Sequence, residues 1–360
     1  MSAAGRVLIE LKRSTGFALN ARFDVPESGV TVLFGPSGCG KTTVLRSIAG
    51  LERSNGYVQI AGHLWQDDEK GVFIPTFRRR LGYVFQEASL FENMNVRRNL
   101  EYGLRRFRDA DGPRRLAEAV ELLGIGHLLD RNPAQLSGGE RQRCAIARSL
   151  CVRPSALLLD EPLAALDQAR RREILPWLER LRRELRIPIL YVTHSEEELM
   201  RLADWLVLMQ DGSVADAGPV QQVLARSGGA GSFAGDVPML LTGQVRDIDR
   251  DWGLAAVDCA GSTVWVAAGG MALGDHVRLS VRASDVTLAL ARPEGLSAQN
   301  AIACRVAGIA EAGSGPQRLV RLDCAGEPLL ALVTARAVNA LGLTVGMNLW
   351  ALVKTVSVLG

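Results

Sequence analysis

The first group of residues suited to chemistry is a glycine-rich segment, 35–42. Its sequence is GPSGCGKT, which matches G-x-x-x-x-G-K-[ST]. Glycines allow successive backbone N–H groups to turn toward a phosphate, and the N-terminus of a following helix adds its dipole. The Lys41 ammonium suits the β- and γ-phosphate oxygens, and the Thr42 hydroxyl suits Mg²⁺. The sequence therefore predicts a nucleotide phosphate site formed by Gly35, Pro36, Ser37, Gly38, Cys39, Gly40, Lys41, Thr42 and Thr43.

A second candidate is a pair of carboxylates after the apolar segment 156–159. This placement lets Asp160 hold Mg²⁺ through water and lets Glu161 polarise an attacking water molecule. A solvated strand end is the alternative interpretation of this pair on its own. A phosphate loop also occurs in GTPases, kinases and helicases, but no guanine-reading N-K-x-D motif is present.

The segment that distinguishes among these classes of phosphate-loop protein is 136–143, LSGGERQR. In it, Ser137, Gly138 and Gly139 open a helix whose backbone amides can face an anion. It resembles the signature motif of the ATP-binding cassette (ABC) family, and the resemblance extends over roughly 6–225 in the family's order. The resemblance implies Mg²⁺-dependent ATP hydrolysis by a homodimer, in which these three residues contact the γ-phosphate bound to the opposite subunit.

Three further positions fit the family order: Gln86 in GYVFQ, Asp167 after Leu166, and His194 at the end of ILYVTH. The resemblance implies that Gln86 senses Mg²⁺ and the γ-phosphate near the membrane-subunit contact. It also implies that Asp167 acts across the dimer, and that His194 holds the γ-phosphate and the water. A strand-end structural histidine is the alternative for His194 alone.

One departure concerns the adenine base. Lys12 stands where family members commonly carry a stacking aromatic residue, and Phe17 is the nearest aromatic side chain. Phe17 is therefore a candidate for base stacking, with a place in the core as the alternative.

The elements that must position these residues follow an α/β pattern. Segments 156–160 and 187–194 are continuous apolar runs of strand length beside helical segments, as in a buried parallel sheet. A helix is expected over 42–49. We predict a P-loop nucleotide-binding domain over 1–226, with a helical subdomain over about 87–150.

The rest of the chain has a different pattern. A linker of small residues is predicted at 227–235, and helical signals nearly vanish beyond it. VDCAG at 257–261 recurs as LDCAG at 322–326, so we predict an OB-like, duplicated all-β regulatory domain with modules 236–292 and 293–360. Chance similarity of two short β segments is the alternative.

Composition excludes several classes of protein. The net charge of +3 over 360 residues does not indicate a nucleic-acid partner. No apolar stretch reaches the roughly 18 to 20 residues that span a bilayer, and the N-terminus lacks a signal-peptide core. The six cysteines form no C-x-x-C pair, so we expect them to be reduced and not to bind metal.

Segments 75–103 and 281–300 resemble the ATPase subunits of molybdate importers. The resemblance implies a homodimer docked on two integral-membrane permease subunits, at the cytoplasmic face of the inner membrane. The complex would receive molybdate or tungstate indirectly from a periplasmic binding protein. Importers of sulfate, ferric iron or polyamine remain an alternative, as does a non-transport cassette ATPase acting on ribosomes or DNA.

The tail also resembles a molybdate-binding β module, which implies regulatory molybdate. Gln299 stands where arginine is usual, and loss of a guanidinium predicts weaker anion binding. A dimer-stabilising module that binds nothing is the alternative. The candidate oxyanion ligands implied by the resemblance are Ser297, Thr334, Lys354 and Thr355, and Asn300 matches an asparagine of the same module.

Overall fold

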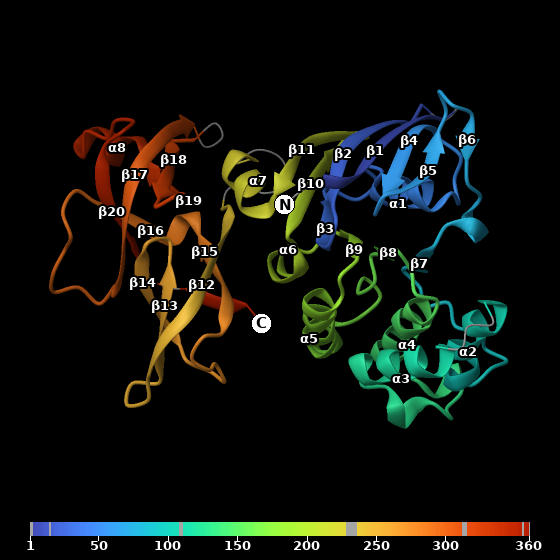
Figure 1. Ribbon diagram of the computed structural model, residues 1–360. Helices are drawn as coiled ribbons and strands as arrows, with labels where there is room; N and C mark the ends of the chain where they lie inside the picture. The colour runs from blue at the N-terminus through green and yellow to red at the C-terminus, as the bar shows by residue number, and fades with distance from the viewer. Residues whose placement is uncertain are drawn as a thin grey trace. The chain divides into compact units, whose positions relative to one another are not determined.

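The computed structural model describes residues 3–13, 16–107, 111–227, 236–311, 315–354 and 356–359. The chain divides into two units, Met1–Gly218 and Pro219–Gly360, shown in Figure 1. No helix in the described parts of the chain is long and apolar enough to cross a membrane.

The N-terminal unit is built on a mixed sheet of 11 described strands in the order β6-β5-β4-β1-β2-β11-β10-β3-β9-β8-β7. Strands β10, β3, β9, β8 and β7 pair with one another in parallel, and β11 pairs in parallel with β2, whereas β1, β2, β4, β5 and β6 form antiparallel pairs among themselves. The strands are β1 (Ala3–Lys12), β2 (Ala18–Pro26), β3 (Gly29–Phe34), β4 (Asn55–Ile60), β5 (His63–Asp67), β6 (Val72–Phe73), β7 (Leu81–Val84), β8 (Ala156–Asp160), β9 (Pro188–Thr193), β10 (Trp205–Gln210) and β11 (Ser213–Pro219).

The parallel strands confirm the predicted buried apolar runs. Every residue of β8 and β9 is buried, because helices cover this part of the sheet. The helices around it are α1 (Lys41–Ala49), α5 (Gln168–Glu184) and α6 (Glu196–Leu202). Since the carboxyl ends of β3, β8 and β9 lie at one edge, the residues that follow them meet there.

A helical segment separates β7 from β8 in the chain. It contains α2 (Val96–Phe107), α3 (Gly112–Leu123) and α4 (Gly138–Cys151), and α4 contacts both other helices. The short helices are η1 (Thr76–Arg78), η2 (Gly126–Leu128) and η3 (Pro133–Gln135). These helices lie within the range predicted for the helical subdomain, apart from η1 and the last residue of α4.

The C-terminal unit contains α7 (Val220–Ser227), which packs on β12 and β19, and two five-stranded sheets. Of the predicted linker only Ser227 is described, and it ends α7; residues 228–235 lie outside the described residues. The elements that follow are β12 (Pro238–Asp249), β13 (Leu254–Cys259), β14 (Ser262–Ala267), β15 (His276–Arg282), η5 (Ala283–Asp285), β16 (Val286–Ala289), β17 (Asn300–Glu311), β18 (Gln317–Cys324), β19 (Glu327–Thr334), α8 (Ala335–Ala340), β20 (Asn348–Val353) and β21 (Ser357–Leu359).

The two sheets repeat one strand order, β14-β13-β12-β15-β21 and β19-β18-β17-β20-β16. The fifth strand of each repeat lies in the other repeat's sheet, since β16 pairs with β20 and β21 pairs with β15. The recurring VDCAG and LDCAG segments form equivalent hairpin turns with positive φ at Ala260 and Ala325. A Cβ at Gly261 would lie 2.7 Å from the Ala325 Cβ, so the two turns are neighbours. This arrangement supports the predicted duplication.

Candidate functional site

The phosphate loop joins β3 to α1, as its sequence predicts. The buried Lys41 ammonium donates to the carbonyl oxygens of Gly35 and Pro36, both at 2.8 Å. A Cβ at Gly35 would lie 2.2 Å from the Met209 carbonyl oxygen, so only glycine fits there. The cap of α1 is Gly40 in the left-handed region, and no side chain caps the helix. Its first amides can therefore face an anion.

The Asp160 carboxylate lies beside the loop and accepts hydrogen bonds from two hydroxyl groups. The Thr42 hydroxyl donates to Asp160 Oδ1 at 2.8 Å, and the Tyr83 hydroxyl donates to Asp160 Oδ2 at 2.9 Å. Burial raises the pKa of Asp160, and the hydrogen bonds from Thr42 and Tyr83 oppose that rise. A hydroxyl and a carboxylate are hard oxygen ligands of the kind that Mg²⁺ prefers. The donor set therefore fits this ion.

The second carboxylate of the pair lies beside the histidine. Glu161 follows β8 with a φ of 43°, an uncommon value for a non-glycine residue. Its backbone N–H donates to the Val192 carbonyl of β9 at 3.1 Å. The Glu161 side chain is largely shielded from solvent, whereas the His194 side chain is half exposed. His194 Nδ1 lies 3.4 Å from Glu161 Oε2. The structure thus brings together a carboxylate and an imidazole from two separate strands.

A cavity of about 400 Å³ covers this site. Phe17 and Arg13 are part of its lining, with the Arg13 guanidinium 5.8 Å from the Phe17 ring centroid. Lys12 does not belong to this lining among the described residues. Sequence reasoning missed Arg13, because one exposed arginine among many carries no distinguishing pattern. The full lining is Arg13, Phe17, Gly38, Gly40, Lys41, Thr42, Thr43 and Glu161.

Ser137 caps the signature helix α4. Its hydroxyl accepts from the Glu140 N–H at 3.3 Å, and its own N–H donates to Glu140 Oε2 at 2.8 Å. This reciprocal capping box, led by the Ser137 N–H, lowers the pKa of Glu140. Cβ atoms at Gly138 and Gly139 would lie 2.8 and 3.2 Å from the side chains of Leu166 and Ile174.

A second cavity, of about 410 Å³, adjoins this helix. Gln86, Gly138 and Leu166 line it together with the buried Gln142, whose Nε2 has no hydrogen-bond partner among the residues that the structure describes. Asp167, next to Leu166, caps α5 by accepting from the Arg170 N–H at 2.9 Å. The structure thus places Gln86 with the signature segment, and neither lines the phosphate-loop cavity of its own chain among the described residues.

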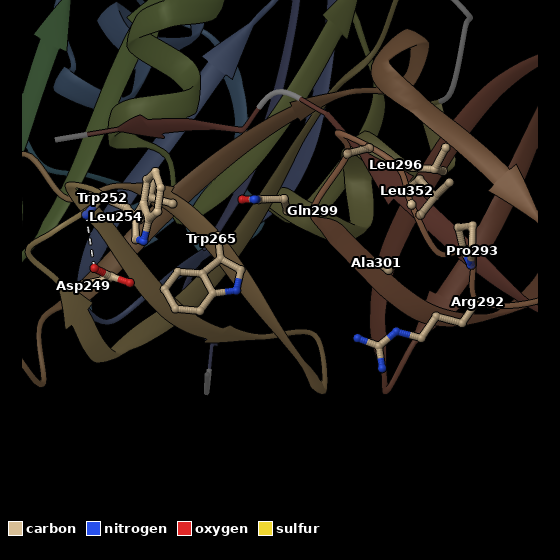
Figure 2. A pocket seen from close by; sticks show the side chains of 12 residues that line it. Asp249, Trp252, Leu254, Trp265, Arg292, Pro293, Leu296, Gln299, Ala301 and Leu352 are labelled. Carbon is tan, nitrogen blue, oxygen red and sulfur yellow. Dashed lines mark hydrogen bonds between the residues drawn. The ribbon is translucent and has the colours of Figure 1, made fainter.

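The C-terminal unit has a third cavity, of about 610 Å³, shown in Figure 2. Gln299 lies in its lining with Trp252, Trp265 and Arg292. Among the described residues, the lining does not include the candidate oxyanion ligands Ser297, Thr334 and Lys354.

These three side chains are all exposed, and the Thr334 hydroxyl caps α8 by accepting from the Ala337 N–H at 3.1 Å. The buried Asn300 side chain bonds both backbone groups of Trp265, at 2.7 and 3.0 Å, which joins β17 to β14. Thr355 lies outside the described residues.

Comparisons with known proteins agree with this geometry. The ABC transporter family model matches residues 19–164, and the TOBE domain model matches residues 296–360. The chain is 48% identical to "Molybdenum import ATP-binding protein ModC 1" of Azotobacter vinelandii over 96% of both chains. It is 47% identical to "Molybdenum import ATP-binding protein ModC" of Thiobacillus denitrificans over the full length of both.

Two solved structures share the fold of the N-terminal unit. One is cbiO1 of Clostridium perfringens, part of the ABC transporter complex cbiONQ, with a TM-score of 0.55 and 27% identity over 63% of this chain and 92% of that chain. The other is a dimeric post-hydrolysis state of the ATP-binding cassette MJ0796 bound to ADP and phosphate, with a TM-score of 0.50 and 26% identity over 60% of this chain and 98% of that one. The sequence identity to these relatives extends over nearly the whole chain, and it agrees with the geometry of the phosphate loop, the paired carboxylates and the capped signature helix. This chain therefore belongs to the ABC transporter family, in the group of the molybdenum import ATP-binding proteins.

Proposed function

We propose that the chain hydrolyses Mg·ATP to drive the import of molybdate, or of the similar oxyanion tungstate, through separate membrane subunits. The observation that carries the ATPase part is the convergence of Lys41, Thr42, Asp160, Glu161 and His194 at one edge of the parallel sheet. The full-length identity to relatives named as molybdenum import proteins carries the choice of substrate.

The phosphate loop would bind the ATP phosphates through the backbone amides that begin α1. Lys41 now donates to two carbonyl oxygens of its own loop, and it would turn toward the β- and γ-phosphate oxygens when ATP is bound. Phe17 offers a ring to the adenine base, and the Arg13 cation adds a second planar group above it.

Thr42 and Asp160 would hold Mg²⁺, Thr42 directly and Asp160 through water. Bound Mg²⁺ neutralises charge that develops on the phosphate oxygens. Glu161 would polarise the attacking water, and His194 would hold the γ-phosphate and that water in line. The 3.4 Å approach of the two side chains supports this division of roles.

Completion of the site requires a second copy of the chain. Ser137, Gly138 and Gly139 line no part of their own phosphate-loop cavity among the described residues, although they begin a helix suited to an anion. In the capping box the Ser137 oxygen accepts a hydrogen bond, so its hydroxyl proton stays available to donate to a phosphate oxygen of the partner subunit's ATP. Asp167 would act across the same dimer.

The remaining partners follow from membership of a transporter family. Gln86 lines a cavity with the signature helix, a position from which a membrane subunit could be linked to the γ-phosphate. We place the dimer on two permease subunits at the cytoplasmic face of the inner membrane, with a periplasmic binding protein acting indirectly. Regulatory molybdate would bind the C-terminal unit through Ser297, Thr334, Lys354 and Thr355.

Molybdate uptake by cells tests the substrate. A strain that lacks the gene should accumulate labelled molybdate only when the wild-type gene is restored, and not when the Glu161→Gln variant is supplied. Unchanged uptake of labelled sulfate serves as the control. Restoration of sulfate uptake instead of molybdate uptake would assign the chain to another importer.

A further inference from the structure

Both carboxylate oxygens of Asp160 are already held by hydroxyl groups. Thr42 donates to Oδ1 at 2.8 Å and Tyr83 donates to Oδ2 at 2.9 Å. Asp160 is 5% exposed, so bulk water competes little with the two hydroxyl groups for its carboxylate oxygens. A carboxylate held at both oxygens cannot turn about its Cβ–Cγ bond without losing a hydrogen bond.

Tyr83 reaches this carboxylate from a different strand. It lies on β7, which runs parallel to β8 with Tyr83 opposite Leu158. Its ring lies 4.5 Å, centroid to centroid, from the ring of Phe85, whose next neighbour in the chain is Gln86. The same tyrosine therefore touches Asp160 and the segment that carries Gln86.

We propose that Tyr83 is a positioning residue for the Mg²⁺ site, whose hydroxyl orients the Asp160 carboxylate and ties it to the Gln86 segment. The inference rests on the proposed Mg·ATP function and adds a residue that acts through Asp160. Groups that hydrogen-bond to a metal-binding carboxylate fix its orientation, and their loss costs roughly 10- to 100-fold in metal affinity or activity.

A purely structural role would require only the ring. Tyr83 also packs against the main core of the N-terminal unit, so truncation to alanine would disturb packing as well as the hydrogen bond. Tyr83→Phe keeps the ring and removes only the hydroxyl. Tyr57→Phe is a matched control, because the Tyr57 hydroxyl on β4 donates to Gln59 at 2.7 Å, away from the nucleotide cavity.

The test measures binding of a fluorescent ATP analogue, mant-ATP, to the full chain in EDTA and in Mg²⁺. For Tyr83→Phe we expect a dissociation constant in EDTA within twofold of wild type, and one in Mg²⁺ weakened about tenfold. The Mg²⁺ concentration that gives half-maximal ATP hydrolysis should rise by a similar factor. Tyr57→Phe should match wild type in each measurement.

Equal Mg²⁺ responses in Tyr83→Phe and wild type would overturn the inference and leave the proposed ATPase function intact. An equal loss in EDTA and in Mg²⁺, with a lower melting temperature, would overturn it in favour of a structural role. Failure of the wild-type chain to bind mant-ATP at all would instead remove the proposed function.

Discussion

His194 Nδ1 lies 3.4 Å from Glu161 Oε2, although the two residues follow different strands of the parallel sheet. Strands β8 and β9 are neighbours, with Asp160 opposite Val192, so their carboxyl ends deliver these two side chains to one point. This contact holds the two side chains together at the edge of the phosphate-loop cavity, where an attacking water would be placed.

Glu161→Gln should bind Mg·ATP and hydrolyse it at least about 100-fold more slowly, because the amide keeps the shape but cannot polarise water as a carboxylate does. The variant should accumulate as an ATP-bound dimer, which size-exclusion chromatography with ATP would detect. Glu173→Gln, an exposed change on α5, is the control. Undiminished phosphate release by Glu161→Gln would contradict the assignment.

Ser137→Arg should abolish hydrolysis while nucleotide binding persists, because Ser137 is expected to act on the partner subunit's ATP. Since Ser137 also caps α4, the variant should lose about 1 kcal/mol of stability, which thermal melting measures. Mixed dimers of Ser137→Arg with a phosphate-loop variant should regain one working site. Loss of mant-ATP binding by Ser137→Arg alone would count against a composite site.

Phe17→Ala should weaken ATP binding by about 5- to 150-fold, since stacking of a base on an aromatic ring contributes about 1 to 3 kcal/mol. Titration with mant-ATP measures the change, and Phe17→Trp should retain the affinity. Lys12→Ala should bind as wild type does, because Lys12 is exposed and outside the described cavity lining. A loss with Lys12→Ala and none with Phe17→Ala would move the base to the other residue.

Arg79→Met should lower the free energy of unfolding by at least about 2 kcal/mol, because charged hydrogen bonds contribute about 1.5 to 3 kcal/mol each. The buried Arg79 guanidinium donates to the Ser47 and Ile48 carbonyls at the end of α1, at 3.2 and 2.5 Å, and burial lowers its pKa to about 10. Urea unfolding measures the change, with the exposed Arg78→Met as the control. Equal stability of the two variants would show that the buried bonds contribute little.

Molybdate should slow the ATPase of the assembled transporter if the oxyanion occupies the C-terminal unit and favours one arrangement of the subunits. Titration of molybdate against ATPase rate is the measurement. Inhibition should weaken in Lys354→Ala, which removes a cation, and strengthen in Gln299→Arg, which restores a guanidinium. No effect of molybdate in any variant would leave the tail as a dimerisation module.

The sequence by itself determined the features that are written into short stretches of chain. The phosphate loop, the apolar run before Asp160 and the start of a helix at Ser137 each depend on residues a few positions apart, so pattern alone identifies them. The duplication of the tail was visible for the same reason, because VDCAG and LDCAG repeat a local turn. Such signals are independent of how the strands are ordered.

Tertiary structure decided which of these residues meet. Tyr83 contacts Asp160 only because β7 pairs with β8, and the exchange of β16 and β21 between the two sheets has no local sequence signal. The structure also separates residues that the sequence had grouped as candidate oxyanion ligands. Ser297, Thr334 and Lys354 lie outside the described lining of the cavity that Gln299 lines. Contacts between distant residues depend on sheet order and packing, which a local pattern cannot encode.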